Sequence, residues 1–267
     1  MIRMLARLFR LRLSLMNGAA ALGGCLLFPA PRNGVTLLAA CAGVSLLAMG
    51  GSALNQVLER RLDALMTRTL GRPLPQGNMN PATAAIIGGC VIMAGLMLIA
   101  AFGGALPCLL GLAALAWYLA VYTPLKQRTP MALPIGALCG ALPPVIGWCL
   151  AGGPVLDFRI MLLAGLLYLW QVPHFLLFQQ RHAADYRRAG IQLPENSRQF
   201  LGLWLAALMA ASMLLPAFGI IGQHAACWYV LLPVPLLVLA LCRCERPLFS
   251  YLNLFPLLVS LALVVQG

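Results

Sequence analysis

Long apolar stretches without a charged residue recur along the whole chain. With Asp, Glu, Lys and Arg taken as breaks, they cover residues 13–31, 33–58, 73–125, 129–156, 160–180, 199–242 and 247–267. A helix that crosses a bilayer needs about 20 apolar residues. Five stretches therefore hold one span each, and two hold a pair, divided near Gly103-Gly104 and near Gly222-Gln223-His224. We expect an all-α membrane protein with about nine transmembrane helices, forming a single domain over residues 1–267.

The basic residues predict how these helices are oriented. Sixteen of the 18 Lys and Arg residues precede the first span or follow the second, fourth, sixth and eighth spans, which leaves only Arg32 and Arg159 on the other side. Loops rich in Lys and Arg face the cytoplasm. We therefore expect a cytoplasmic N-terminus and a C-terminus outside.

Composition and charge exclude several other classes of protein. The chain is 62% hydrophobic and 9% charged, whereas about a quarter of the residues in a soluble domain are charged. The net charge of +12 is explained by topology and by attraction to anionic membrane lipid, and we expect no nucleic-acid partner. An anionic substrate at the cytoplasmic face is the alternative explanation. Most of the nine cysteines lie inside spans as small apolar residues, so they do not indicate a disulfide framework.

An acidic stripe followed by arginines comes directly after the second span. Asn55, Glu59 and Asp63 are spaced four residues apart, which places them within an arc of about 80° on one helix face. An amide and two carboxylates offer the oxygen ligands that Mg²⁺ prefers, often with substrate phosphates. Arg68 and Arg72 repeat the spacing, and guanidinium groups bind phosphate oxygens well. The alternative is a solvated helix end with pairs between neighbouring charges.

Two later segments add polar groups near the same membrane face. Tyr122, Lys126 and Arg128 follow the fourth span, and Pro143-Pro144 interrupts the fifth, where irregular backbone is tolerated beside a cavity. The sixth span ends with Trp170, Gln171 and His174, and Asp185 and Tyr186 follow it. An ionisable residue within a span, such as His174, is a candidate functional group, or else a neutral histidine bonded to a neighbouring helix.

These segments together resemble the heme O synthase family (protoheme IX farnesyltransferases) of the UbiA-type intramembrane prenyltransferases. The resemblance covers about residues 10 to 195 and rests on motifs that occur in the family's order: Asn55…Asp63…Met66-Thr67-Arg68-Thr69…Arg72-Pro73-Leu74, Tyr122-Thr123…Lys126…Arg128-Thr129-Pro130, Gly140 to Trp148 with Pro143-Pro144, Trp170-Gln171…Pro173-His174, and Asp185-Tyr186…Ala189-Gly190-Ile191.

The resemblance implies a fold, a reaction and roles for the site residues. It implies helices around a central cavity that opens toward the cytoplasmic side of a bacterial inner membrane, and Mg²⁺-dependent transfer of farnesyl from farnesyl diphosphate to heme b. The expected metal ligands are Asn55, Glu59, Asp63 and Asp185; the expected diphosphate-binding and catalytic cations are Arg68, Arg72, Lys126 and Arg128; and the expected substrate contacts are Tyr122, Trp170, Gln171, Tyr186 and, for heme, His174. A downstream heme-modifying enzyme or a terminal oxidase assembly is the expected partner.

Three departures and two alternatives accompany this interpretation. Glu59 stands where the family has Asp, Arg10 stands where a Lys-Pro pair is usual, and the chain is short at its C-terminus. One alternative is a sister enzyme that prenylates an aromatic quinone precursor, which would share the diphosphate site but not need His174. The other is a transporter or heme-handling protein. A transporter should carry paired broken helices and charges near the membrane midplane, and this sequence shows neither.

Overall fold

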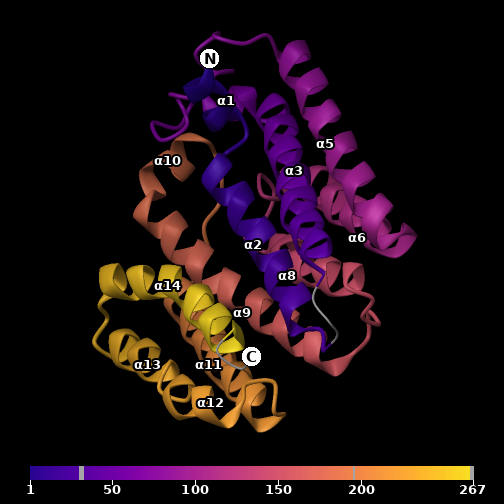
Figure 1. Ribbon diagram of the computed structural model, residues 1–267. Coiled ribbons are helices and arrows are strands. Elements are labelled where there is room, and N and C mark those ends of the chain that lie inside the picture. Colours follow the sequence, from indigo (N-terminus) through magenta and orange to yellow (C-terminus); the bar gives the residue numbers. More distant parts are fainter. Residues whose placement is uncertain (30–32, 195, 265–267) are drawn as a thin grey trace.

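A computed structural model describes residues 1–29, 33–194 and 196–264, and these residues form helices without any strand. Figure 1 shows α2 running between α3 and α9, with α5 and α6 on one flank and α11 to α14 on the other. The helices are α1 (Ile2–Leu8), α2 (Leu11–Leu27), α3 (Gly34–Leu58), α4 (Arg60–Asp63), α5 (Pro81–Gly103), α6 (Ala105–Ala116), η1 (Trp117–Tyr122), α7 (Thr123–Leu125), α8 (Ala132–Leu150), α9 (Phe158–Arg181), α10 (Ala183–Arg188), α11 (Ser197–Ala217), α12 (Gln223–Tyr229), α13 (Pro233–Leu241) and α14 (Glu245–Val264).

The expected membrane spans are present in the described part of the chain. Eight helical segments are long and apolar enough to cross a membrane, counting α6 to α7 and α12 to α13 as one each. The ninth expected span is the shorter α2, with 17 residues. The two long apolar stretches divide as predicted, at Gly104 and before Gln223. Arg32, one of the two basic residues assigned to the outer side, lies outside the described residues.

Local sequence signals set several helix ends. The side chains of Asn33, Asn80 and Asp157 accept hydrogen bonds from backbone N–H groups in the first turns of α3, α5 and α9, the usual N-cap arrangement. Gly104 has a φ of 75° where α5 turns into α6, a conformation that glycine adopts without steric cost. The sequence predicts an interruption at Pro143-Pro144, but α8 continues through both prolines, which are buried.

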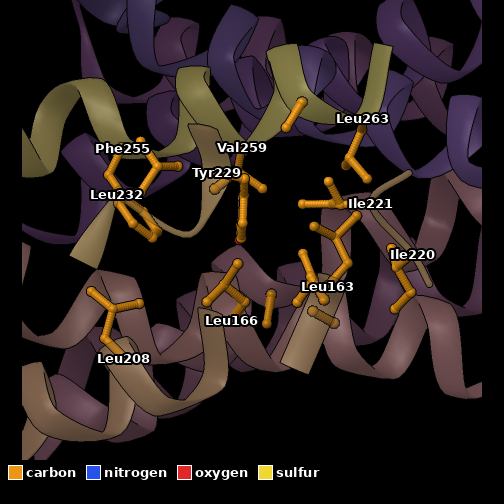
Figure 2. Close-up of a cluster of buried hydrophobic side chains, with 14 of the residues drawn as sticks. Leu163, Leu166, Leu208, Ile220, Ile221, Tyr229, Leu232, Phe255, Val259 and Leu263 are labelled. Atoms are coloured by element: carbon orange, nitrogen blue, oxygen red, sulfur yellow. The ribbon is translucent and has the colours of Figure 1, made fainter. Parts of the chain in front are cut away.

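Two apolar cores hold the bundle together. The larger one joins α8 and α9 to α11, α12 and α14, and Figure 2 shows part of it, including Leu166 of α9, Tyr229 of α12 and Phe255 of α14. The second joins α2, α3, α5 and α8. Small residues let these helices approach closely: a Cβ on Gly24 would lie 1.8 Å from the Pro144 carbonyl oxygen, and one on Gly147 would lie 1.8 Å from that of Ala21. Such contacts are typical of helix packing in lipid, and they fix α2 against α8.

Candidate active site

The acidic stripe lies at the end of α3, as the sequence predicts. The helical hydrogen bonds continue past the end of α3, from the Glu59 N–H to the Asn55 carbonyl at 2.9 Å and from the Asp63 N–H to the Glu59 carbonyl at 2.8 Å. The three side chains therefore stay on one face. Asn55, Glu59 and Asp63 are 3%, 3% and 1% exposed, so each needs a polar partner.

Cations from the predicted set provide these partners. Lys126 Nζ donates to Glu59 Oε2 at 2.7 Å and lies 2.5 Å from Oε1. Arg72 Nη1 donates to Asp63 Oδ2 at 2.6 Å. Asn55 Nδ2 also donates to Glu59 Oε2, at 2.9 Å. The stripe is therefore a charge-compensated network within the protein, which excludes the alternative of a solvated helix end.

A π-helical turn brings two tyrosines to this network. In η1, Tyr118 and Tyr122 stack with ring centroids 6.0 Å apart, and Lys126 lies 5.6 Å from the Tyr122 ring. π-helical turns occur often at functional sites. Thr123 Oγ1 donates to Asn55 Oδ1 at 2.8 Å, which ties the turn to α3.

Glycines of α8 make room for polar side chains from two directions. A Cβ on Gly136 would lie 2.2 Å from the Tyr122 ring, and a Cβ on Gly140 would lie 2.2 Å from the Gln171 amide. These two glycines are one helical turn apart, so the same face of α8 receives η1 and α9.

Except for Thr123, the groups described above line one cavity of about 260 Å³. Its polar end contains Asn55, Glu59 and Asp63 with their cations, and its remaining wall is largely apolar. Its lining includes Arg10, Val44, Leu47, Asn55, Glu59, Asp63, Arg68, Arg72, Tyr118, Tyr122, Lys126, Leu133, Gly136, Ala137, Gly140, Pro143, Ile146, Gln171, Phe175, Phe178, Gln179 and Tyr186. A cavity beside Pro143 was expected from the sequence.

The expected substrate contacts on α9 lie on two different faces of the helix. Gln171, Phe175 and Phe178 line the cavity. Trp170 and His174 each lie one position earlier, about 100° around the helix, and contact α14 instead. The His174 ring stacks between Trp170 and Phe249 at centroid distances of 5.0 and 5.2 Å, and its Nδ1 is buried without a hydrogen-bond partner among the described residues.

Asp185 lies apart from the acidic stripe and has partners of its own. Asp185 is 6% exposed and accepts hydrogen bonds from the backbone N–H groups of Thr67 and Arg68, both at 3.1 Å, and it pairs with Arg188. It joins the loop after α4 to α10 but is not among the residues that line the cavity. Its neighbour Tyr186 does line the cavity, whereas Arg128 is exposed and does not.

The surroundings shift the pKa of several groups near the cavity mouth. Burial lowers the pKa of Lys126 below its usual value, although Glu59 and Asp63 act in the opposite direction. Burial raises the pKa of Tyr186. For Asp185, burial alone would raise the pKa, but hydrogen bonds from Arg68, Thr67 and Arg188 together lower it below its usual value.

The donor groups of the stripe suit a hard cation. Asn55, Glu59 and Asp63 offer one amide and two carboxylates, which are the oxygen ligands of Mg²⁺ sites that are completed by water and substrate phosphates. The described residues contain no group of three His, Cys, Asp or Glu side chains that would hold a metal alone. The set therefore fits a metal that arrives with an anionic ligand.

Sequence reasoning missed several residues that line the cavity. Tyr118 lies one turn before Tyr122, and Phe178 and Gln179 continue the face that Gln171 begins. Their helical spacing was a usable signal for all three. Arg10 also lines the cavity, although the sequence marked it only as a departure from the family pattern.

The family model described as the UbiA prenyltransferase family matches residues 16–248. The chain belongs to the UbiA prenyltransferase family. This confirms the resemblance drawn from the motifs, and it makes the protein a membrane-embedded prenyltransferase, so the transporter alternative is wrong. The match also extends well beyond residue 195, where the motifs end.

Relatives within this family are similar along nearly the whole chain. A protein of Geobacter sulfurreducens called protoheme IX farnesyltransferase is 58% identical over 267 residues, covering 97% of each chain. One of Oleidesulfovibrio alaskensis with the same name is 40% identical, covering 84% of this chain and 81% of that protein.

Solved structures of UbiA homologues share the fold. The apo homologue from Aeropyrum pernix superposes with a TM-score of 0.75 at 18% identity, covering 96% of this chain and 98% of that one. The homologue from Archaeoglobus fulgidus bound to DMAPP and Mg²⁺ superposes with a TM-score of 0.67 at 12% identity, covering 98% and 99%.

Proposed function

We propose that this prenyltransferase transfers the farnesyl group of farnesyl diphosphate to a vinyl group of heme b, giving heme O, with Mg²⁺ as cofactor. The observation that carries the proposal is the polarity of the cavity, which has oxygen ligands and cations at one end and apolar walls beyond. An allylic diphosphate has the same polarity. The names of the relatives supply the identity of the prenyl group and of the acceptor.

The polar end accounts for recognition and departure of the diphosphate. Asn55, Glu59 and Asp63 would hold Mg²⁺, which when bound neutralises the charge that develops on a departing diphosphate. Arg72 and Lys126, which are paired with Asp63 and Glu59, would bind phosphate oxygens if these carboxylates held the metal, and Arg68 lines the same cavity. Cations and a metal at the point where negative charge develops lower the barrier to ionisation.

The apolar walls account for the survival of the farnesyl cation. Val44, Leu47 and Ile146 line the cavity away from the polar end, and such a surface excludes the water that would otherwise capture the cation.

Aromatic rings line the same cavity. Tyr118, Tyr122, Phe175 and Phe178 line the cavity, and aromatic faces attract cations. In the transfer itself, the C1–oxygen bond of farnesyl diphosphate breaks, the diphosphate takes the electron pair, and a heme vinyl carbon bonds to C1. Water then adds to the resulting carbocation and loses one proton, leaving a hydroxyethylfarnesyl group.

We place the heme beside α9. Gln171 and Phe175 line the cavity there, and the Phe175 ring contacts His174 with centroids 5.4 Å apart. A heme that moves Phe175 would meet His174, so we keep His174 as a heme contact, with Trp170 stacked behind it. Asp185, proposed from the family motif as a further metal ligand, would have to leave the backbone of Thr67 and Arg68 to reach the metal.

The charge distribution supports a cytoplasmic position for the polar end of the cavity. The bacterial relatives favour a bacterial inner membrane, and we propose that the product passes to a heme-modifying enzyme or an oxidase assembly. Single cysteines at exposed Arg128 and at Leu156, which is 81% exposed between α8 and α9, should react with an impermeant thiol reagent from opposite sides. Reaction from one side only would contradict this orientation.

The decisive experiment supplies purified protein with heme b, farnesyl diphosphate and Mg²⁺, followed by chromatography and mass analysis of the pigment. Farnesylated, hydrated heme is the expected product. Parallel reactions contain 4-hydroxybenzoate in place of heme. Prenylation of the phenol without any modified heme would contradict the proposal and support the sister enzyme that makes quinone precursors.

A further inference from the structure

Arg10 has a backbone conformation that residues with a side chain rarely adopt. It lies between α1 and α2 with φ 45° and ψ 51°, at the break between the two helices near the N-terminus in Figure 1. In this left-handed region a Cβ crowds the following carbonyl, so glycine is the usual occupant. Strained residues of this kind persist where the surrounding structure fixes them, and they cluster at functional sites.

Gln56 of α3 fixes the chain just before Arg10. Its Nε2 donates to the carbonyl of Leu8 at 2.6 Å and to that of Arg7 at 3.2 Å, and its side chain is fully buried. Gln56 directly follows Asn55 in α3. The helix that carries the acidic stripe therefore also sets the position of the turn at Arg10.

Ser14 fixes the chain on the other side of the turn. Its Oγ donates to the Phe9 carbonyl at 2.7 Å, and its N–H donates to the Arg10 carbonyl at 3.1 Å. Leu8 is fully buried in a small core with Ala53 and Leu74. These contacts determine the turn from both ends, so the strain at Arg10 is imposed by the fold.

The consequence of the turn is that Arg10 lines the polar end of the cavity together with Glu59 and Asp63. Two cations of this end are already paired, Lys126 with Glu59 and Arg72 with Asp63. The Arg10 guanidinium, in contrast, has no hydrogen bond or ion pair with any residue that the structure describes. It is a cation that an anionic ligand can engage without first separating an ion pair.

We propose that Arg10 is a substrate-anchoring residue that binds the diphosphate of the prenyl donor, and that Gln56 is the positioning residue that holds Arg10 in place. The inference rests on the proposed function, because it takes the cavity to be the diphosphate site. A guanidinium binds phosphate oxygens through two parallel hydrogen bonds, which an unpaired arginine can form in full.

Arg10→Gly separates this role from a structural one, because glycine adopts the turn without strain while the charge is lost. We expect the variant to unfold at a temperature equal to or above that of the wild type, and its KM for farnesyl diphosphate to rise about tenfold, or about 1.4 kcal/mol. Arg12→Ala is the control: Arg12 is exposed on α2 and does not line the cavity, so its KM should stay unchanged. A wild-type KM in Arg10→Gly would overturn the proposal.

Gln56→Met tests the positioning role, because it keeps the length of the side chain but removes the donor. Alone, it should raise the KM for farnesyl diphosphate while changing kcat little. Combined with Arg10→Gly, it should add no further rise, since Gln56 acts through Arg10. A full additional rise in the double variant would show that Gln56 acts elsewhere.

A binding competition between farnesyl diphosphate and inorganic diphosphate, with Mg²⁺ present, tests the proposed function and the role of Arg10 separately. Wild-type protein that binds neither farnesyl diphosphate nor inorganic diphosphate would refute the proposed function itself. Wild-type protein that binds both, with Arg10→Gly binding them equally well, would refute only the role of Arg10.

Discussion

Lys126, just after α7, donates a hydrogen bond of 2.7 Å to Glu59, a residue 67 positions earlier at the end of α3. Arg72 and Asp63 form the same kind of pair nine positions apart. The cations predicted to bind diphosphate therefore hold the carboxylates predicted to bind metal. We infer that with a metal diphosphate bound, the carboxylates would hold the metal and the cations would bind the phosphate, so the buried charges would be compensated both with and without the ligand.

Removing one member of the pair should destabilise the protein more than removing both. Lys126→Met leaves the buried Glu59 carboxylate without its cation, which should cost about 1.5–3 kcal/mol. Adding Glu59→Gln should restore much of that loss, because a neutral amide needs no counter-charge. Thermal unfolding in one detergent measures both variants. Arg128→Met at an exposed position is the control and should stay within about 0.5 kcal/mol of the wild type. A double variant no more stable than Lys126→Met would contradict the pairing.

The pH dependence of turnover should reveal the buried lysine. Burial lowers the pKa of Lys126, so the ammonium is lost at a lower pH than for a lysine in water, and activity should fall as the pH rises through that depressed value. Lys126→Arg keeps its charge to much higher pH. We therefore expect the alkaline limb of kcat/KM for farnesyl diphosphate to move to higher pH in Lys126→Arg. If the alkaline limb does not move in Lys126→Arg, a titrating group other than Lys126 causes the loss of activity at high pH.

Gly136 tests the position of Tyr122. A Cβ there would lie 2.2 Å from the Tyr122 ring, so Gly136→Ala has to displace η1 or α8. Overpacking of this kind costs about 1–3 kcal/mol, and we expect lower kcat together with lower thermal stability. Gly165→Ala is the matched control, because a Cβ on Gly165 of α9 would meet nothing within 4 Å among the described residues. Equal effects of the two substitutions would show that the contact with Tyr122 has no special role.

Those features of the site that follow from helical periodicity could be predicted from the sequence. Asn55, Glu59 and Asp63 share a face because their spacing matches the period of the helix, and the apolar stretches located the spans for the same reason. The pairing of their charges could not be predicted, because Lys126 reaches Glu59 only through the packing of η1 and α8 against α3.

The remaining differences have tertiary causes as well. Trp170 and His174 belong to the same sequence motif as Gln171, but they lie on the face of α9 that packs against α14. The sequence does not show which face of α9 meets the cavity, because that depends on how the helices pack. Arg10 is directed into the cavity by Gln56, 46 positions away in the sequence, and no local pattern in the sequence indicates a left-handed arginine.

His174 should affect the acceptor and leave the donor unchanged. His174→Phe retains a ring between Trp170 and Phe249 but removes both nitrogens, so packing on α14 should survive. We expect weaker binding of heme b, measured by absorbance titration, with an unchanged KM for farnesyl diphosphate. Heme binding equal to that of the wild type would make His174 a packing residue, and a raised KM for farnesyl diphosphate alone would place it at the donor site.

The dependence of heme farnesylation on Mg²⁺ concentration tests the central claim most directly. Wild-type turnover should rise to saturation with Mg²⁺. Asp63→Asn keeps the shape of the side chain but removes a charge from the proposed metal site, so its turnover should fall about a hundredfold, equivalent to about 2.7 kcal/mol of transition-state stabilisation, and should need more Mg²⁺. Glu245→Gln, at the start of α14 and outside the cavity lining, should behave as the wild type. A wild-type Mg²⁺ response in Asp63→Asn, or wild-type turnover that ignores Mg²⁺, would contradict the assignment of this cavity as a metal-dependent diphosphate site.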